Sequence, residues 1–485
     1  MIKLNKEELR DKIYACFVGK NIGGTMGGPF EGSRKLNDCE GFTTPKGRAL
    51  PNDDLDLQLV WLKAMWEHGP HHLDANILGE YWNVLIGPIW AEYGNAKSNM
   101  QTGIAPPVSG QYKNGWKHSN GAWIRTEIWA SMFPGDIEKA VEFAFKDACV
   151  DHGIGDGTYA AVFVAALQSA AFICKDVRKL IEIGLANIPS DCRFSTYIKK
   201  TIECYDNGMD WKDTWKILVD MALDDPELGW FQAPADVSFA IMGLLYGGND
   251  FKKGMLITLN CGDDADCSCG TYGSIMGIMH GMSIIPDDWM EYIGDEIVTK
   301  CIDITKMNTF RYTMPKTCTM LTDMIISIIP TTLHTRPIII TDEPTSFTQE
   351  DMDRFYEERY NFSEHPEYFF DVKSTLVKAR IVFPDGIDIE PLQEKKIKLQ
   401  LQSRFHIQDT YKIRWILPDG WSVKGKKSYS VNCIPYDFLD KSLPEFEQEY
   451  TIIAGENVDA RNPIILEVIS EGHFEPLLYE FVFMG

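Results

Sequence analysis

Two short acidic stretches hold the residues in this chain that are best suited to do chemistry. Residues 261–267 read CGDDADC and residues 51–57 read PNDDLDL. The carboxylates are Asp263, Asp264 and Asp266 in the first stretch, and Asp53, Asp54 and Asp56 in the second. Like charges at this spacing repel one another, and carboxylate oxygens are the ligands that Mg²⁺, Mn²⁺ and Ca²⁺ prefer. The two stretches therefore predict a shared divalent cation, with ordinary acidic loops as the alternative.

Both stretches stand where a helical pattern begins. The run MLITLN (255–260) resembles a strand that leads into residues 261–267, and GTYGSIMGIMHG (270–281) is typical of a glycine-rich helix. One aspartate can cap a helix, but three in four residues exceed what a cap needs. On a loop that enters a helix, carboxylates can converge, and the positive end of the helix dipole favours them there.

Glycine spacing indicates how the two stretches could meet. Glycines recur every four residues in two places, at Gly19, Gly23 and Gly27 and at Gly273, Gly277 and Gly281. Such a stripe leaves a smooth helix face that lets another backbone approach closely. We expect tight helix packing from these stripes, which would bring the two acidic loops into one site.

Hydrophobic periodicity predicts a mainly α fold, an orthogonal multi-helix bundle with a C-terminal β-sandwich. Apolar residues recur at helical spacing over 138–150, 157–174 and 235–248. Residues 330–347 change in character and resemble a linker. Beyond them, alternating segments predict strands over 396–405, 410–421 and 462–470. We therefore expect a helical catalytic domain over 1–332 and a β-sandwich accessory domain over 345–485.

Composition and charge exclude several classes of partner. The chain has 485 residues and a net charge of −23, so nucleic acid and anionic membrane surfaces would repel it. We find neither a signal peptide nor an apolar run of membrane-spanning length in the sequence. With no export signal, the 12 cysteines are expected to be reduced thiols in the cytoplasm. A homo-oligomer is compatible with the sequence.

Five motifs, in this order, resemble the ADP-ribosylglycohydrolase family over about residues 8–325. They are GGPFE (27–31), PNDDLDLQLVWL (51–62), SNGAWIRTEIWASMFPGD (119–136), DACVDHGIGDGTYAAVFVAA (147–166) and CGDDADCSCGTYGSIMG (261–277). The resemblance implies an orthogonal helical bundle around a site that usually holds two Mg²⁺ ions. It also implies a metal-dependent glycoside hydrolase that cleaves an ADP-ribosyl bond on a small-molecule or protein-linked substrate.

The resemblance also implies roles for individual residues. The metal ligands fall on Asn52, Asp53, Asp54, Asp264, Asp266 and Cys267. Catalysis falls on Glu31, near the glycosidic bond, and on Asp264. The substrate pocket falls on Ser119, Asn120 and Gly121 and on Asp151, His152 and Gly153.

Two of these positions depart from the family pattern. Asn52 replaces a hydroxyl with an amide, whose carbonyl oxygen can still bind a hard cation. Cys267 replaces a hydroxyl with a thiol, a poor partner for Mg²⁺. The number of Mg²⁺ ions therefore stays open at one or two, and Mn²⁺ is an alternative metal.

The substrate and the part played by some polar residues also stay open. The alternatives are a glycosidase of the same fold acting on another nucleoside, furanoside or sugar conjugate, and a catalytically silent ligand-binding homologue. Arg125 could pair with a phosphate, but we favour an internal ion pair with Glu127 or another acidic side chain.

Overall fold

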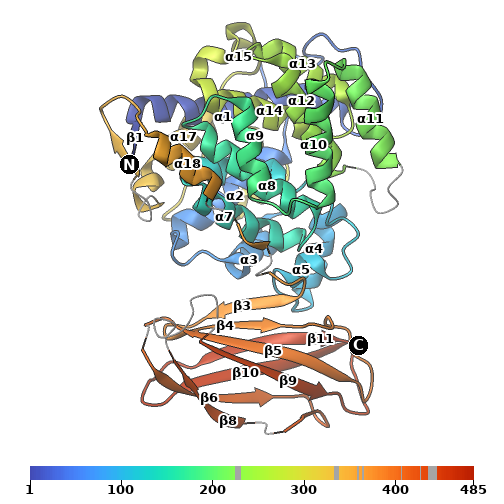
Figure 1. Ribbon diagram of the computed structural model, residues 1–485, viewed down its shortest axis with the longest axis vertical. Helices are drawn as coiled ribbons and strands as arrows, with labels where there is room; N and C mark the ends of the chain where they lie inside the picture. The colour runs from blue at the N-terminus through green and yellow to red at the C-terminus, as the bar shows by residue number, and fades with distance from the viewer. Residues whose placement is uncertain are drawn as a thin grey trace. The chain divides into compact units, whose positions relative to one another are not determined.

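The predicted fold class, mainly helical with a C-terminal β-sandwich, is confirmed by the computed structural model of the chain (Figure 1). The structure describes residues 1–223, 231–332, 338–357, 360–362, 365–405, 407–425, 428–434 and 445–485. The chain divides into two compact units. Met1–Lys97 and Lys113–Phe362 form the first unit, and Ser98–Tyr112 and Ser363–Gly485 form the second.

The first unit is built from helices and one small sheet. Its longer helices are α1 (Lys6–Gly27), α2 (Asp53–His68), α3 (Ala75–Leu85), α4 (Ala91–Gln101, whose end belongs to the second unit), α7 (Ile137–Asp151), α8 (Asp156–Ala171), α9 (Val177–Ala186), α10 (Arg193–Asp206), α11 (Trp211–Leu223), α12 (Ala233–Gly247), α13 (Phe251–Cys261), α14 (Ala265–His280), α17 (Cys318–Thr332) and α18 (Gln349–Glu357). Shorter helices are η1 (Gly28–Phe30), η2 (Trp123–Arg125), α6 (Glu127–Met132), η3 (Gly281–Ile284), α15 (Asp287–Ile293) and α16 (Ile304–Met307). Strands β1 (Ile2–Asn5) and β2 (Ile338–Thr341) pair in parallel.

Three predicted helices are confirmed, and one predicted strand is wrong. The helices expected over 138–150, 157–174 and 235–248 are α7, α8 and α12. Residues 255–260, interpreted as a strand, belong to α13. This helix begins at Asp250, whose carboxylate accepts a hydrogen bond from the Lys253 amide at 3.0 Å. Gly254 lets α13 approach α12, since a Cβ on Gly247 would lie 2.4 Å from its Cα. The apolar pattern of residues 255–260 is compatible with either a strand or a helix, and the helix cap and tertiary packing favour the helix.

Helices α1 and α14 are in direct backbone contact along the glycine stripes, as the sequence predicted (Figure 1). A Cβ on Gly19 would lie 2.2 Å from the Gly273 carbonyl oxygen, and a Cβ on Gly27 would lie 2.3 Å from the Asp266 Cα. Gly277 similarly faces Ala15. Side chains at these positions would separate the helices, because protein interiors leave no room for extra carbon atoms. Glycine therefore joins the end of α1 to the start of α14.

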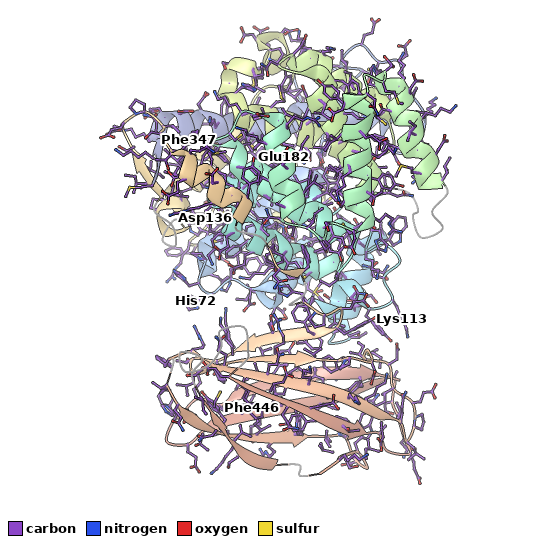
Figure 2. All side chains as sticks on the ribbon, viewed as in Figure 1. His72, Lys113, Asp136, Glu182, Phe347 and Phe446 are labelled. Atoms are coloured by element: carbon purple, nitrogen blue, oxygen red, sulfur yellow. The ribbon has the colours of Figure 1, made fainter. Side chains whose placement is uncertain are left out.

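The second unit is a sandwich of two antiparallel sheets. Its strands are β3 (Phe369–Lys373), β4 (Val377–Val382), β5 (Glu394–Ser403), β6 (Asp409–Ile416), β7 (Ser422–Val423), β8 (Ser428–Cys433), β9 (Phe446–Ile453), β10 (Arg461–Ser470) and β11 (Leu477–Met484). One sheet has the order β11-β10-β6-β8 and the other β3-β4-β5-β9-β7. Side chains fill the space between the sheets, and Phe446 packs against this core (Figure 2). The alternating burial of β5 and β10 produces the two inward faces.

The bounds of the units differ from the boundaries expected at 332 and 345. The segment Ser98–Tyr112 belongs to the second unit because Ile104, Val108 and Tyr112 join the core of the sandwich. The Tyr112 hydroxyl also donates a hydrogen bond to Asp388 at 2.6 Å. The first unit continues past residue 332 with β2, the partner of β1. Residues 333–337 of the expected linker lie outside the described residues.

Within the ranges that the structure describes, no helix is both long enough and apolar enough to cross a bilayer.

Candidate active site

The start of α2 presents the first acidic stretch. Asn52 precedes the helix with an extended backbone, and its Oδ1 accepts a hydrogen bond from the Asp54 amide at 2.7 Å. Asn52 is therefore the N-cap, so a cation bound there would share this oxygen with the helix end. The side chains of Asp53 and Asp54 are left available, because the cap needs neither of them.

The start of α14 presents the second acidic stretch. Asp264 occupies the N-cap position, but its carboxylate makes no cap hydrogen bond to the described backbone. Asp266 lies in the first turn, and both residues are less than a tenth exposed. Ordinary capping thus does not account for either carboxylate at this helix end.

Side chains from the two helix starts and from the end of η1 converge. Oxygen or sulfur atoms of Asp54, Asp266 and Cys267 all lie within 4.8 Å of one another. The same holds for one atom each from Glu31, Asp264 and Asp266. Asp266 belongs to both groups, so the two predicted ligand stretches share one acidic site.

Burial and mutual repulsion perturb these carboxyl groups. Burial, and after it the neighbouring carboxylates, raise the pKa values of Asp264 and Asp266 well above the ordinary value of 3.8. Burial also raises the pKa of Asp54 to about 7, although the Lys20 ammonium opposes this shift. The protein surroundings alone therefore do not stabilise these carboxyl groups in their charged form.

A buried lysine supplies part of the missing positive charge. The Lys20 Nζ lies 3.0 Å from Asp54 Oδ2 and 3.3 Å from Glu127 Oε1, and it donates to the Ile124 carbonyl at 2.6 Å. Lys20 and Asp54 are each almost completely buried. A buried ammonium is stable only when such partners surround it. Lys20 therefore holds the Asp54 carboxylate from within the helical core.

Cys267 also contacts Asp54. Its Sγ lies 3.4 Å from Asp54 Oδ1, with the thiol as the donor. Burial, and then the charge of Asp264, raise the pKa of the Cys267 thiol well above its ordinary value of 9.0. The group is thus a neutral thiol that donates to a carboxylate.

Asn120 ties the acidic site to a further buried carboxylate. Its Nδ2 donates to Asp264 Oδ2 at 2.7 Å and to Asp236 Oδ2 at 2.6 Å, while its Oδ1 accepts from the Trp123 indole at 2.9 Å. Asn120 is 3% exposed and Asp236 is fully buried. Asp236 and Trp123 thus fix the Asn120 amide, which in turn orients the Asp264 carboxylate.

Glu31 lies at the more accessible side of the site. It follows η1 and is an exposed residue, unlike Asp264 and Asp266. Loss of water around its carboxylate and the charge of Asp53 raise the pKa of Glu31, whereas Lys300 lowers it. Asp53 is half-buried, and its Oδ2 accepts a hydrogen bond from the Tyr93 hydroxyl at 3.0 Å.

The end of α7 and the loop before η2 lie against each other. The Ser119 hydroxyl lies 3.2 Å from His152 Nε2 and donates to the Trp116 carbonyl at 2.6 Å. The His152 Nδ1 lies 3.0 Å from the Asp151 carboxylate. Asp151 and His152 are fully buried. These residues therefore form an internal wall that supports Ser119.

Arg125 makes an internal ion pair, as the sequence favoured, but its partners are Asp147 and Asp151, whereas Glu127 pairs with Lys20. Its Nη2 lies 2.7 Å from Asp151 Oδ1 and 2.8 Å from Asp147 Oδ1, and its Nη1 donates to the Gly121 carbonyl. Burial alone would raise the pKa of Asp151, but Arg125 and His152 hold it at about 2. The guanidinium thus binds together the two segments named as pocket residues.

Two glycines shape the same region. A Cβ on Gly121 would lie 2.3 Å from Glu92 Oε1, so a larger residue there would displace the Glu92 side chain. Gly153 ends α7 with a φ of 58°, and its carbonyl accepts a hydrogen bond from the Thr158 hydroxyl at 2.7 Å. Glycine adopts this backbone conformation without strain.

Asp56 does not join the acidic site, although it belongs to the same run of aspartates. Its Oδ2 accepts hydrogen bonds from the backbone amides of Lys300 and Cys301 at 2.6 and 2.5 Å. Asp56 therefore anchors the 300–301 segment to α2.

Sequence reasoning missed four residues of this region: Lys20, Tyr93, Asp236 and Lys300. The signal for Lys20 was a charged residue within the small-residue stripe of α1. Asp236 lies in the first turn of α12, where an acidic residue ordinarily indicates only a helix start.

The donor set fits a hard divalent cation. Glu31, Asp264 and Asp266 supply only carboxylate oxygens, which suit Mg²⁺ or Mn²⁺. The buried Asp266 Oδ1 has no hydrogen-bond partner among the residues that the structure describes. An orphaned buried carboxylate oxygen is costly, and a cation would satisfy it. The group that contains Cys267 fits less well, since it includes a neutral thiol beside the Lys20 ammonium.

Comparison with protein-family models matches the ADP-ribosylglycohydrolase family over residues 5–313. Among solved structures, the chain is similar to an ADP-ribosylglycohydrolase-related protein complex, with 17% identity, a TM-score of 0.46, and coverage of 67% of this chain and 100% of that chain. It is also similar to a FixG-related protein from Vibrio parahaemolyticus (12% identity, TM-score 0.18, 23% of this chain and 97% of that chain). A third similar structure is the GAE domain of GGA2p from Saccharomyces cerevisiae (14% identity, TM-score 0.17, 24% and 97%). Structural similarities this weak carry no functional argument. The comparison with curated protein sequences finds no match.

Proposed function

The chain belongs to the ADP-ribosylglycohydrolase family, a family of hydrolases, and on this premise we propose that it is a metal-dependent glycosidase that cleaves an ADP-ribosyl bond. The observation that carries the proposal is that Asp266, whose buried Oδ1 lacks a partner within the described part of the chain, lies within 4.8 Å of Asp54 in one group of side chains and of Asp264 and Glu31 in another.

In this proposal Asp264 and Asp266 would hold Mg²⁺, which Mn²⁺ can replace, while Glu31 lies beside them as the catalytic residue. Asp53, Asp54 and the side-chain carbonyl of Asn52, at the start of α2, would support a second ion. When bound, a divalent cation of this kind holds ribose hydroxyl groups and activates water. Asn120 fixes Asp264, and Lys20 and Cys267 fix Asp54, so the ligand oxygens are oriented before any ion binds.

Glu31 is the residue that we propose to accept a proton from the attacking water. It is exposed to solvent, whereas Asp264 and Asp266 are buried. Its pKa is raised, which moves a carboxylate toward the range in which general bases work at neutral pH. Hydrolysis of a ribosyl bond also develops positive charge on the sugar, which nearby carboxylates stabilise.

The walls of the substrate pocket are proposed to come from Ser119–Gly121 and from Asp151–Gly153. In this proposal Asp151 and His152, which are fully buried, support Ser119, which is itself only 3% exposed, rather than contact the substrate. Arg125 would keep both walls in place through Asp151 and the Gly121 carbonyl.

Release of ADP-ribose tests the proposal. The purified protein is incubated with ADP-ribosylated arginine and serine peptides, with Mg²⁺ or with a chelator. We expect hydrolysis that requires the metal and that falls at least about 100-fold in Asp264→Asn and Glu31→Gln, since loss of one such group ordinarily costs this much. Asp213→Asn is the matched control, because Asp213 also lies in the first turn of a helix but is exposed.

Two results would overturn this assignment. A wild-type protein that releases no ADP-ribose from any of these peptides, yet hydrolyses a nucleoside or furanoside with Mg²⁺, would be a glycosidase of the alternative class. If Asp264→Asn has no effect on either metal binding or hydrolysis, the acidic site is not the catalytic centre.

A further inference from the structure

Two segments that are far apart in the sequence are joined beside the start of α2. The backbone of residues 85–87 is hydrogen bonded to the backbone of residues 301–303. The amides of Lys300 and Cys301 both donate to the buried Asp56 carboxylate of α2. The position of Lys300 is therefore fixed by the same helix that presents Asp53 and Asp54.

The turn that follows residues 85–87 carries an exposed tryptophan. Trp90 is 51% exposed, whereas Trp61, Trp82, Trp123 and Trp129 are fully buried. The turn is tight, since Ala91 has a φ of 45° and a Cβ on Gly94 would lie 2.0 Å from the Ile89 carbonyl oxygen. A constrained turn restricts the conformations of an indole ring at the surface. Ligand binding then costs less conformational entropy, which favours affinity.

Lys300 lies over this tryptophan. Its Nζ is 5.9 Å from the centre of the Trp90 ring, and the residue is exposed. No ion pair joins the Lys300 ammonium to any carboxylate within the described ranges of the chain. In a protein with a net charge of −23, a cation without such a partner beside an acidic site is positioned to attract anions.

Both residues adjoin the acidic site. The Trp90 ring lies 6.3 Å from the ring of Tyr93, whose hydroxyl donates to Asp53 at 3.0 Å. The Lys300 amide donates to Asp56, which lies in the same helical turn of α2 as Asp53. Trp90 and Lys300 thus stand at the rim of the site on the side of Asp53.

We propose that Trp90 and Lys300 form a binding platform for the nucleoside diphosphate part of the substrate. A planar heterocyclic base stacks on the exposed indole of Trp90, and the diphosphate pairs with the Lys300 ammonium. The platform rests on the proposed function, since it places the diphosphate next to the carboxylates that would hold the ribose. It also explains how a strongly acidic protein attracts a substrate that is itself negatively charged.

Calorimetry with ADP and with adenosine tests the platform on the full chain in the presence of Mg²⁺. In Lys300→Gln we expect ADP affinity to fall about tenfold or more, with adenosine affinity unchanged, because only ADP carries phosphate. In Trp90→Ala we expect both affinities to fall about tenfold, since base stacking is lost. Lys300→Gln alters only an exposed side chain, so it keeps the test valid even if Trp90→Ala folds poorly.

A second lysine–tryptophan pair provides the matched control. Lys212 lies 5.5 Å from the ring of Trp211 at the start of α11, with no link to the acidic site. Lys212→Gln and Trp211→Ala should bind ADP as the wild type does.

The outcomes separate the platform from the proposed function. A wild-type protein that does not bind ADP at millimolar concentration, or platform variants that bind ADP as tightly as the wild type, overturn the platform whether or not ADP-ribose is released. ADP binding that depends on Trp90 and Lys300 supports the platform. This holds even if the protein hydrolyses no ADP-ribosyl bond, a result that would refute only the proposed function.

Discussion

Replacing Gly27 with alanine should weaken metal binding by moving one acidic stretch away from the other. Gly27 ends α1, and a Cβ there would lie 2.3 Å from both the Cα and the N of Asp266. These are backbone atoms, so no flexible side chain can move aside. The start of α14 must shift by about 1 Å to restore ordinary contact distances near 3.4 Å. That shift would carry Asp266 away from Asp54.

The expected magnitudes follow from the geometry. Extra carbon in a packed core costs about 1–3 kcal/mol, and alanine returns up to about 1 kcal/mol of helix propensity. The variant should therefore lose no more than about 3 kcal/mol of unfolding free energy when metal is absent. Misplaced ligands should weaken Mn²⁺ binding about 10- to 100-fold, which is comparable to the loss of an outer-shell contact.

Calorimetric Mn²⁺ titration and urea denaturation with a chelator measure the two quantities. Gly19→Ala is the first control, since a Cβ there would meet the Gly273 carbonyl at 2.2 Å, which is two turns from Asp266. It should cost similar stability with a smaller loss of Mn²⁺ affinity. Gly115→Ala is the second control, because nothing lies within 4 Å of a Cβ there.

One result would refute this reasoning. If Gly27→Ala binds Mn²⁺ as tightly as Gly115→Ala does, the contact between α1 and α14 does not position the ligands.

The other predictions concern buried polar groups. Lys20→Met should cost about 3–5 kcal/mol of unfolding free energy in chelator, because it leaves Asp54 without its cation; an unchanged urea midpoint would contradict this. Asn120→Ala should weaken Mn²⁺ binding about 10- to 100-fold, because Asp264 loses the amide donor that orients it. Titration with Mn²⁺ measures the affinity, and an unchanged value would count against this role of Asn120. The pKa of Asp151 is depressed to about 2, so its ion pair stabilises the fold above about pH 3.8 and is lost as the pH falls through 2. The difference in unfolding free energy between wild type and Asp151→Asn should therefore decrease as the pH falls from about 3.8 to 2. A constant difference would contradict the stabilising role of the Asp151 ion pair.

The part of the site that the sequence revealed depends on residue identity alone. A run of aspartates indicates a site of repelling charges, and a four-residue glycine spacing indicates a close helix contact. Both inferences hold without knowledge of the fold, because each residue type restricts what can pack against it. The stripe that contains Gly27 therefore indicated a close helix contact beside the acidic stretches, and this contact falls on Asp266. The same logic predicted the ion pair of Arg125, since an arginine among apolar residues needs a buried acid.

Other features depend on partners that are distant in the sequence. Lys20 stands among small residues of α1, and only the fold brings it to Asp54 and Glu127. Asp236 resembles an ordinary residue of a first helical turn, and its link to Asp264 passes through Asn120. No local pattern could show either contact.

Short apolar segments were the least predictable parts of the fold. Residues 255–260 are too few for their periodicity to separate a strand from a helix, and the cap at Asp250 lies outside the run. The segment Ser98–Tyr112 lacks any regular spacing, so nothing in it indicates that Ile104 and Val108 join the core of the sandwich.

Anomalous diffraction from a Mn²⁺-soaked crystal tests the central claim most directly, that the two acidic helix starts share one divalent cation. The account predicts an anomalous peak about 2.0–2.3 Å from an oxygen of Asp266, with further ligands from Asp264 and from Asp54. A map without a peak among these carboxylates, from a crystal soaked in millimolar Mn²⁺, would contradict it.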